Sequence, residues 1–515
     1  MKKVVSSKDA VSLIKDGMTV GVCGFVPTGP VEELLKALGD RFRETGNPKN
    51  LTILMPATPG DRQTRGAIHL AQEGLVKWVV TSHMNFAPQL MELVFANKVA
   101  CNFMPLAAQM HMIRARAGGF PGILTPVGLG TFVDPRKEGG RANSISPPSL
   151  SEVMVIDGKE YLFYRTMKMD VAFIRGTSAD TKGNISIERE AVNFDQIVFA
   201  QAARSSGGIV IAQVERLVEA GSIKPQSVCI PGIMVDYVVK AAPGNSPQSF
   251  GIEYDPSCCG EIRVPLDSLS SMEMDERKII SRRAALELVA GAVVNLGVGV
   301  PEGVSQIMAE EGLDGKFTLS LEAGGIGGRP TGGLAFGAAV NPEAIINSCS
   351  ILDFYDGGGI DFGCLGFAEL DKHGNTNVSK FSGRMIGPGG YIDISQNAKI
   401  MLFCGSFTAG GLKIATGDGK LTIVQEGRAK KFVDSVEQVT YSGEYAATVG
   451  QNTSYITERA VFKLTREGLL LTEIAPGVDL QRDVLDQMHF APKVASDLKL
   501  MDERIFYNKP MGLAL

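Results

Sequence analysis

Hydrophobic residues along this chain follow two alternating periodicities. Short β-branched runs at residues 51–56, 78–82, 171–176 and 207–218 predict buried strands. Between such runs, segments such as PVEELLKAL and FDQIVFAQAARSS place apolar residues three and four positions apart, as on one face of a helix. Strands that alternate with helices predict an α/β fold with largely parallel sheets.

The two halves of the chain repeat one helix–strand–turn–helix pattern. In the first half it contains Gly17 and the turn VPTG, which ends at Gly29. In the second half it contains Gly291 and the turn VPEG, which ends at Gly303. The offset is 274 residues for both glycine pairs, the difference between 291 and 17 and between 303 and 29. A constant offset indicates a duplication, so we expect two similar open α/β domains.

A second repeated motif, D-x-x-G-N, begins at Asp180 and again at Asp371, an offset of 191, the difference between those two numbers. Its Asp, Gly and Asn predict a tight turn between strands. The smaller offset means that the first half holds roughly eighty extra residues, which we place around 128–152. We expect the first domain to cover residues 1–270 and the second residues 271–515, with the boundary near residue 270 in a polar, charged stretch.

The composition is that of a globular protein and excludes several partners. The chain has 515 residues, of which 44% are hydrophobic and 21% charged, with a net charge of −5 and no basic cluster. We therefore expect no nucleic-acid partner. The first residues lack the apolar core of a signal peptide, and no apolar run is long enough to span a bilayer, so we expect a cytoplasmic protein with no membrane partner.

Cysteine and histidine spacing gives no sign of a metal site. The eight cysteines form no C-x-x-C pair, and the five histidines show no H-x-x-x-H spacing. We expect buried cysteines in a reducing compartment and no bound metal. Glycine is the unusual component, at 60 of 515 residues. This excess over the ordinary share of about 7% indicates turns or close backbone contacts at some site.

One carboxylate stands at the start of a glycine-rich loop. The segment SLEAGGIGGRPTGG, residues 320–333, holds six glycines, and its only acid, Glu322, follows an apolar strand-like run. Ligands of open α/β sheets bind beyond the carboxyl ends of the strands. The turn around Val298 and Gly299, and a third turn at Gly410 and Gly411, also follow predicted strands, so their backbone N–H groups could face the same crevice.

Backbone N–H groups aimed at one point stabilise an oxyanion, and a carboxylate beside them can act as a nucleophile on an activated acyl group such as a thioester. Other interpretations stay open from the residues alone. Glu322 could be a solvated rim residue, and the glycine turns could be structural. A dinucleotide site is a further alternative, although GVGVPEG is G-x-G-x-x-x-G rather than G-x-G-x-x-G, and the chain has no P-loop and no G-x-S-x-G motif.

Five segments carry a resemblance to a known family: SLEAGGIGGRPTGGLAFGAAVNPEAIINS, LDFYDGGGIDFGCLGFAELDKHGNTNVSKF, QNAKIMLFCGSFTAGGLKI, TPVGLGTFVDPRKEGG and IPGIMVDYVV. Together they resemble the class I coenzyme A transferases, in the branch that acts on acetate, propionate and other short acyl groups. The resemblance covers nearly the whole chain. It implies two CoA-transferase/NagB-like α/β domains in one chain, with the first on the acyl and carboxylate side and the second carrying the nucleophile.

The resemblance also implies the chemistry. Glu322 would form an acyl-glutamyl anhydride with acyl-CoA and then a glutamyl-CoA thioester, in ping-pong exchange with a carboxylate acceptor and with no metal or redox cofactor, since coenzyme A is a substrate. The family's homo-oligomers imply a dimer or a tetramer. The implied backbone contacts to the oxyanion and to coenzyme A are Val298, Gly299, Gly410 and Gly411, and the implied acyl-binding turn contains Gly24, Phe25, Val26 and Gly29.

One residue departs from the family pattern. Where the family often has Pro-Gln-Gly, this chain has Pro105-Leu106-Ala107, and Gln109 follows within one helical turn. Leu106 would favour a larger or more apolar acyl group, and Gln109 is a possible substitute for the missing glutamine. An acyl-CoA hydrolase of the same fold and a non-catalytic CoA- or nucleotide-binding protein are the two alternative functions.

Overall fold

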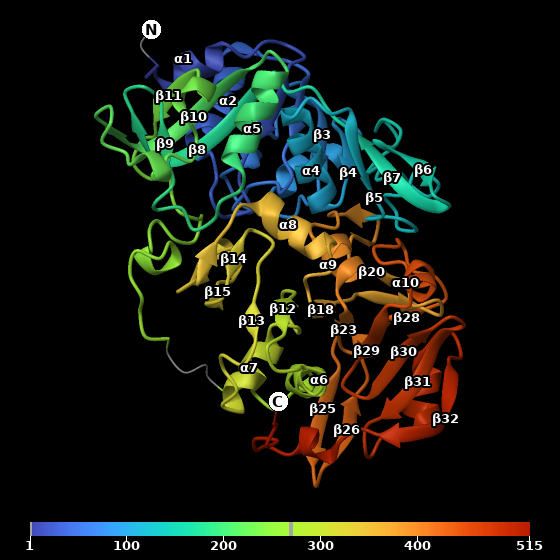
Figure 1. The fold of residues 1–515 in the computed structure, drawn as a ribbon. Coiled ribbons are helices and arrows are strands. Elements are labelled where there is room, and N and C mark those ends of the chain that lie inside the picture. Colours follow the sequence, from blue (N-terminus) through green and yellow to red (C-terminus); the bar gives the residue numbers. More distant parts are fainter. Residues whose placement is uncertain (1–2, 267–270, 515) are drawn as a thin grey trace.

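The computed structural model describes residues 3–266 and 271–514, and it forms two lobes, one above the other in Figure 1. Each lobe is built on one large sheet of mostly parallel strands, so the predicted α/β class is confirmed. The strands of the first large sheet lie within residues 19–240, and those of the second within residues 293–500. The boundary expected near residue 270 lies outside the described residues.

The sheet of the first lobe is parallel except for the short strand β9. Its order is β11-β10-β8-β1-β2-β3-β4, and β9 pairs antiparallel with β8. Every residue of β8 is buried because this strand lies between β1 and β10 and is covered on both faces. The strands are β1 (Thr19–Val22), β2 (Leu51–Leu54), β3 (Val76–Thr81), β4 (Ala100–Phe103), β8 (Val171–Asp180), β9 (Ile185–Ser186), β10 (Ile209–Val218) and β11 (Tyr237–Lys240).

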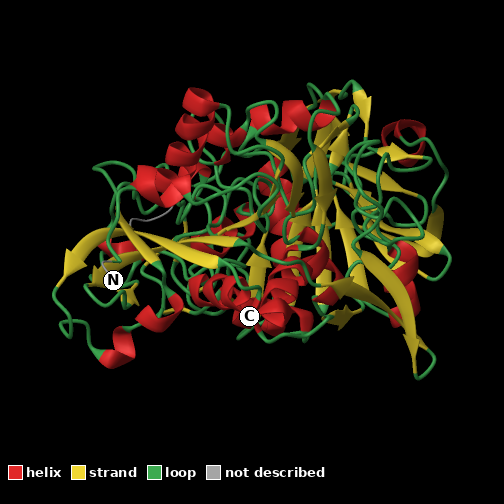
Figure 2. Cartoon of the chain, turned by 90° about the horizontal axis from the view of Figure 1, so that it is seen from above, coloured by secondary structure: helices red, strands yellow, loops and turns green. Residues whose placement is uncertain are grey.

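Helices cover both faces of the strands, as the view from above shows (Figure 2). In the first lobe α1, α2 and α3 pack in one buried cluster with β1 and β2, whereas α4 and α5 pack in another on the opposite face. The helices of this lobe are α1 (Ser7–Ser12), α2 (Glu32–Thr45), α3 (Pro88–Phe95), α4 (Leu106–Ala117) and α5 (Gln196–Ser205).

The sheet of the second lobe is parallel at one end and mixed at the other. Its order is β13-β12-β18-β23-β29-β30-β31-β32, and β30 pairs antiparallel with both neighbours. The strands are β12 (Val293–Leu296), β13 (Thr318–Leu319), β18 (Phe362–Gly366), β23 (Ile400–Cys404), β29 (Asn452–Ile456), β30 (Ala460–Thr465), β31 (Gly468–Ile474) and β32 (Lys493–Leu500). Its helices are α6 (Glu276–Ala285), α7 (Gly303–Glu310), α8 (Ser348–Asp356), α9 (Tyr391–Asn397) and α10 (Gly443–Val449).

Smaller sheets decorate the two lobes. A three-stranded antiparallel sheet in the first lobe contains β5 (Gly122–Thr125), β6 (Ser151–Ile156) and β7 (Lys159–Arg165). The second lobe carries β14 (Gly325–Ile326), β15 (Arg329–Pro330), β16 (Ala339–Val340), β17 (Ala344–Ile345), β19 (Glu369–Asp371), β20 (Thr376–Asn377), β21 (Lys380–Phe381), β22 (Arg384–Met385), β24 (Thr408–Ala409), β25 (Lys413–Gly417), β26 (Lys420–Gln425), β27 (Ala429–Lys430) and β28 (Phe432–Val433).

The positions at which corresponding strands begin reproduce the two sequence offsets. Strand β12 begins 274 residues after β1, at Val293 and Thr19, and β18 begins 191 residues after β8, at Phe362 and Val171. The pairs match as well, because β1 is parallel to β8 and β12 is parallel to β18. A hydrogen bond at the start of the strand is also repeated: Asp170 accepts the N–H of Thr19 in β1, and Asp361 accepts the N–H of Val293 in β12. The two lobes therefore share one repeated structural unit.

The additional residues of the first lobe form more than the stretch expected for them. Residues 128–152 are only a part, because β3, β4 and the antiparallel sheet of β5, β6 and β7 also fall between β2 and β8. In the second lobe the short strands β14 to β17, one 3-10 turn and helix α8 separate β13 from β18. The extra segment thus widens the first sheet by two parallel strands, which sequence offsets alone could not locate.

The two lobes meet through their inner helices. Helices α8 and α9 lie between the two sheets in Figure 1, and α8 packs against α4 of the first lobe. One buried cluster joins residues of both lobes, among them Met112 of α4, Phe199 of α5, Leu352 of α8 and Ile394 of α9. Because one apolar core continues across the boundary, the inner helices hold a fixed frame for anything bound between the lobes.

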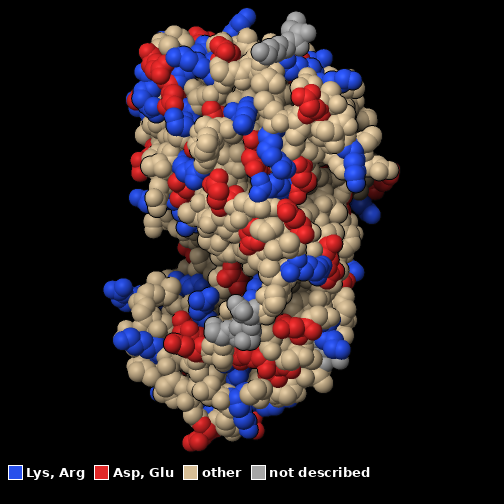
Figure 3. All heavy atoms as spheres, turned by 90° about the vertical axis from the view of Figure 1, so that its left-hand side faces the viewer, with Lys and Arg blue, Asp and Glu red and all other residues tan. Residues whose placement is uncertain are grey.

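The surface agrees with the low net charge. Figure 3 shows acidic and basic side chains interspersed over one face, and a hollow where the upper and lower lobes meet. Among residues 3–266 and 271–514, no helix has the length and apolar character that a membrane crossing requires.

Candidate active site

A cavity of about 470 Å³ lies between the lobes and contains the predicted carboxylate. Its apolar wall joins Phe25 and Leu106 of the first lobe to Leu321, Phe336 and Leu365 of the second, and its polar lining includes Glu322. Further lining residues are Val26, Ala57, Arg62, Ser82, His83, Asn85, Phe86, Asn295, Leu296, Gly297, Val298, Glu302, Ala323, Gly332, Gly333, Gly337, Pro388, Gly389, Gly390, Tyr391 and Ile394.

Glu322 lies just beyond the carboxyl end of β13, an edge strand that pairs with β12. The chain turns sharply there, because the N–H of Gly324 bonds back to the carbonyl of Leu321. Gly324 has a φ of +104°, and a Cβ at this position would be 2.0 Å from the carbonyl oxygen of Ile346. Only glycine fits at position 324, so Gly324 is needed for the turn that directs Glu322 into the cavity.

The carboxylate of Glu322 touches a second glycine from a distant segment. A Cβ on Gly390 would be 2.9 Å from Oε2 of Glu322 and 3.0 Å from its Cδ. Gly390 ends the run GPGG, residues 387–390, directly before helix α9. This close approach presses the carboxylate against backbone rather than against a solvated side chain.

Burial dominates the electrostatics of this carboxylate. Desolvation raises the pKa of Glu322 to about 7, because the charged form loses water that the cavity wall does not replace. Asp393, on the first turn of α9, is completely buried, and desolvation together with the charge of Glu322 raises its pKa to about 7 as well. Two carboxyl groups with raised pKa therefore lie close enough for the charge of Glu322 to affect Asp393.

Backbone donors near Glu322 come from the turn after β12. The N–H of Gly297 continues the sheet by bonding to the carbonyl of Cys364. The N–H of Gly299 bonds to the side chain of Glu302, whose pKa burial raises. Val298 lines the cavity, and no backbone bond within the described residues uses its N–H. Of the two residues predicted in this turn, Val298 is therefore the one whose N–H is not used by another backbone group of the described residues, although its side chain is largely exposed.

The third glycine turn lies away from the cavity wall. Gly410 and Gly411 are exposed between β24 and β25 and are absent from the cavity lining. Their carbonyl groups bind side chains of the same lobe, Arg428 at Gly410 and Gln425 at Gly411. In this structure the two residues border solvent, so a ligand would have to extend out of the cavity to reach them.

The turn from Gly24 to Gly29 divides into lining and supporting residues. Phe25 and Val26 line the cavity, whereas Gly24 and Gly29 do not. Gly24 has a φ of +132°, and a Cβ there would be 2.9 Å from the carbonyl oxygen of Gly29, so the glycines shape the turn that presents Phe25. The ring of Phe25 stacks on Phe336 of the other lobe, with centroids 5.9 Å apart.

The residues around Leu106 fall into two environments. Leu106 is the first residue of α4, is 1% exposed and lines the cavity. Gln109 is also buried, but its amide donates to the carbonyl of Val80 at 2.8 Å, and it is not among the lining residues. Gln109 therefore does not contribute its side chain to the cavity lining. His111 lies at the interface of the lobes, 3.1 Å from a carboxylate oxygen of Asp353.

Several lining residues were not predicted from the sequence. Arg62 follows β2, and His83 and Asn85 follow β3, at the carboxyl ends where the open-sheet rule places ligands. Burial lowers the pKa of His83 to about 4, so its imidazole is neutral at pH 7. The run GPGG before α9 was the available signal for Gly390. Within the described residues, no group of three or more His, Cys, Asp and Glu side chains could hold a metal ion.

Comparisons with known proteins bear on the family of the chain. Residues 4–241 match the family model described as Coenzyme A transferase. The chain is 46% identical over 519 residues to a caffeate CoA-transferase of Acetobacterium woodii, covering 100% of this chain and 99% of the relative. It is 44% identical over 514 residues to the acetate CoA-transferase YdiF of Escherichia coli strain K12, covering 99% of this chain and 96% of the relative.

Solved structures extend the likeness to the fold. The apoenzyme of the acyl-CoA transferase YdiF from Escherichia coli O157:H7 superposes with a TM-score of 0.94 at 43% identity, covering 100% of this chain and 98% of that one. Its thioester complex with CoA superposes with a TM-score of 0.91 at 42% identity and the same coverage. The predicted resemblance is therefore confirmed: the chain belongs to the coenzyme A transferase family and is a CoA-transferase.

Proposed function

We propose that this enzyme moves coenzyme A from a short-chain acyl-CoA, such as acetyl-CoA or propionyl-CoA, to a carboxylate acceptor, with Glu322 as the covalent nucleophile. The single observation that carries the proposal is the position of Glu322: a desolvated carboxylate in a cavity between the lobes, pressed against backbone at Gly390. The likeness to YdiF, which is described as an acetate CoA-transferase, supports the short acyl group.

The proposed steps balance without any cofactor, since coenzyme A is itself a substrate. A carboxylate oxygen of Glu322 attacks the acyl carbon, the C–S bond breaks, and CoA leaves as a thiolate, so that an acyl-glutamyl anhydride remains. The thiolate then attacks the glutamyl carbon, the first carboxylate leaves, and a glutamyl-CoA thioester forms. An incoming carboxylate reverses both steps and regenerates the Glu322 anion.

Backbone amides stabilise the charge that develops on the oxygen in each addition. We assign this role first to the N–H of Val298, which lines the cavity. Removing one such donor typically costs about 3–4 kcal/mol of transition-state stabilisation. Gly299 remains a proposed contact for the coenzyme A chain, and Gly410 and Gly411 would contact only a part of that chain that extends out of the cavity. Phe25 and Val26 contact the acyl group, and Gly24 and Gly29 hold their turn in place.

The two lobes supply different parts of the proposed site. In this proposal the first domain, residues 1–270, supplies the acyl wall, and the second, residues 271–515, supplies the nucleophile. The apolar contact of Phe25 with Phe336 excludes water from the acyl side, which favours transfer over hydrolysis. We further propose a cytoplasmic enzyme that assembles as a homodimer or homotetramer, as the family resemblance implies.

Isotope exchange tests the reaction type. The purified enzyme is incubated with propionyl-CoA and labelled acetate, and both labelled acetyl-CoA and free CoA are quantified. The proposal predicts labelled acetyl-CoA and parallel double-reciprocal plots for the two substrates. A hydrolase of the same fold would release free CoA without any acceptor, and a protein that only binds CoA would give neither product.

A further inference from the structure

We propose that Asp393 is a positioning residue of the transfer site, because it anchors helix α4 of the first lobe to helix α9, which directly follows the loop that supports Glu322. This inference rests on the proposed function, in which Glu322 is the nucleophile and Leu106 is part of the acyl wall. Asp393 itself does not line the cavity. Its role is to hold the two walls at a fixed separation.

The start of α4 is held by the opposite lobe. The residue before the helix, Pro105, provides no side-chain cap, so the first N–H groups of α4 need other partners. The N–H of Ala107 donates to Oδ2 of Asp393 at 3.2 Å, and the N–H of Leu106 donates to the carbonyl of Gly389 at 3.2 Å. Asp393 therefore performs across the lobe boundary what an N-cap residue performs within a helix.

The same loop contacts the nucleophile. Gly389 binds Leu106, and the next residue, Gly390, lies against the carboxylate of Glu322. Three residues further on, Asp393 completes the second bond to α4. A displacement of α4 relative to α9 would therefore change the position of Leu106 and the support of Glu322 together. A misplacement of about 1 Å at a reacting centre can reduce a rate about 100-fold.

The carboxyl group of Asp393 lies in the interior of the protein, not on its surface. Asp393 is 0% exposed, and its second oxygen, Oδ1, has no hydrogen-bond partner within the described part of the chain. A buried acid with one unsatisfied oxygen is costly, and such costs concentrate at functional sites. An amide oxygen can accept the bond from Ala107 equally well, so asparagine preserves the anchor and alanine removes it.

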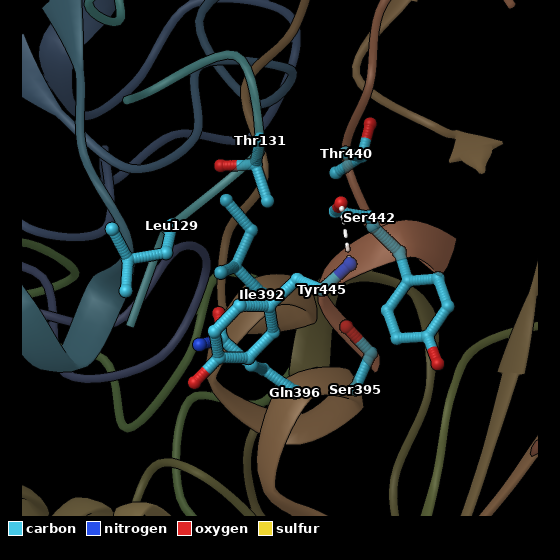
Figure 4. Close-up of a pocket in the computed structure, with 9 residues that line it drawn as sticks. Leu129, Thr131, Ile392, Ser395, Gln396, Thr440, Ser442 and Tyr445 are labelled. Atoms are coloured by element: carbon cyan, nitrogen blue, oxygen red, sulfur yellow. Dashed lines mark hydrogen bonds between the residues drawn. The ribbon is translucent and has the colours of Figure 1, made fainter. Parts of the chain in front are cut away.

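Helix α9 offers a matched control. Gln396, three residues after Asp393, also bonds across the lobe boundary: its amide donates to the carbonyl of Pro126 at 2.7 Å and accepts the N–H of Gly128 at 2.9 Å. Figure 4 shows Gln396 beside Leu129 of the first lobe, and Gln396 is absent from the lining of the cavity that contains Glu322. Loss of Gln396 thus weakens the same interface without touching the start of α4.

The experiment compares wild type with D393A, D393N and Q396A in full-length protein. Wild type should form the Glu322 adduct with propionyl-CoA, detected by mass in single turnovers. We expect D393A to slow adduct formation about 10- to 100-fold, whereas D393N and Q396A stay within about threefold of wild type. Thermal melting verifies that each variant is folded. If D393A does not fold, D393S replaces it, because the shorter serine hydroxyl does not reach Ala107.

Two results would overturn the inference. One is a D393A or D393S rate within threefold of wild type, and the other is a Q396A rate as slow as that of D393A, which would reduce Asp393 to an ordinary interface contact. Failure of the proposed function is a different outcome, since wild type itself would then form no adduct at Glu322.

Discussion

Glu322 combines two requirements that oppose each other, because a nucleophile must be ionised and a desolvated carboxylate resists ionisation. The cavity raises the pKa of Glu322 to about 7, which leaves a substantial anionic fraction at neutral pH while the anion stays poorly hydrated and reactive. A solvated glutamate on the rim would keep a pKa near 4.3. The two cases differ in how activity depends on pH.

We predict that kcat/KM for acyl-CoA rises with pH through an apparent pKa of about 7. The anion attacks, so the rate falls about tenfold for each pH unit below 7 and levels off above it. The measurement is the initial rate of acyl exchange between pH 5 and pH 9, with protein stability checked at each end. A profile that is flat from pH 5 to pH 8 would contradict burial of the nucleophile.

Leu106 governs acyl size in this account. It occupies the cavity wall where the family often carries glutamine, and it is 1% exposed. We predict that Leu106→Gln shifts the ratio of kcat/KM for butyryl-CoA over acetyl-CoA downward about 5- to 10-fold, because a methylene in an apolar pocket contributes about 1–3 kcal/mol. Leu106→Met, which conserves volume and polarity, should leave the ratio unchanged. An unchanged acyl profile in Leu106→Gln would refute this role.

At the level of elements, the glycine turns have separate tasks. Gly324 permits the bend that aims Glu322, and Gly24 permits the turn that presents Phe25. Gly390 is different, because its φ of −85° suits any residue, and only the proximity of Glu322 excludes a side chain. The backbone of Gly390, at the end of the run GPGG before α9, thus supports the carboxylate.

We predict that Gly390→Ala lowers kcat/KM at least tenfold while the melting temperature stays close to that of wild type. The added methyl would lie 2.9 Å from Oε2 of Glu322 and displace the carboxylate. Gly332→Ala is the control, since Gly332 also lines the cavity, has a φ of −113° and has open space around its Cβ position. Equal activities of the two variants would show that the contact between Gly390 and Glu322 is unimportant.

The elements that the sequence predicted well are those with a local signal. The strands at 51–56 and 171–176 appear as β2 and β8, and both D-x-x-G-N motifs form turns in which Asp180 and Asp371 accept backbone N–H groups. Helix α7 begins at Gly303, the residue that ends the VPEG turn of the repeated pattern. Element boundaries of this kind depend on turn geometry that no periodicity records.

The site was predicted only as far as each residue has its own sequence signal. Glu322 and Val298 follow predicted strands, Phe25 was implied by the family resemblance, and all three line the cavity. Arg62, His83, Gly390 and Asp393 contribute through contacts between segments that are far apart in the chain, for example the bond from Ala107 to Asp393. Such contacts depend on how the two lobes dock, and a single sequence carries no direct pattern for docking.

For the whole molecule, the half-buried carboxylate of Glu322 is a cost to stability. The native state binds the Glu322 proton more tightly than the unfolded chain does, because burial raises the native pKa to about 7 while the unfolded value is near 4.3. The free energy of unfolding therefore falls as pH rises from about 4 through about 7, and above pH 7 the full cost of the buried charge applies.

We predict that Glu322→Gln stabilises the protein at pH 8 by about 1–3 kcal/mol, whereas the two proteins have similar stability at pH 4.5. The glutamine fills the same space and never carries a charge. The measurement is the unfolding midpoint of both proteins at the two pH values. A variant that is less stable than wild type at pH 8 would contradict the cost assigned to the carboxylate.

The central claim is that Glu322 becomes covalently attached to substrate, and peptide mapping tests it most directly. Wild type and Glu322→Gln are incubated with propionyl-CoA in the absence of acceptor, trapped with borohydride and digested, and the modified peptide is identified by mass. The account predicts a modified side chain at position 322 in wild type and none in the variant. An unmodified Glu322 peptide in an enzyme that still exchanges acyl groups, or an adduct on any other residue, would contradict it.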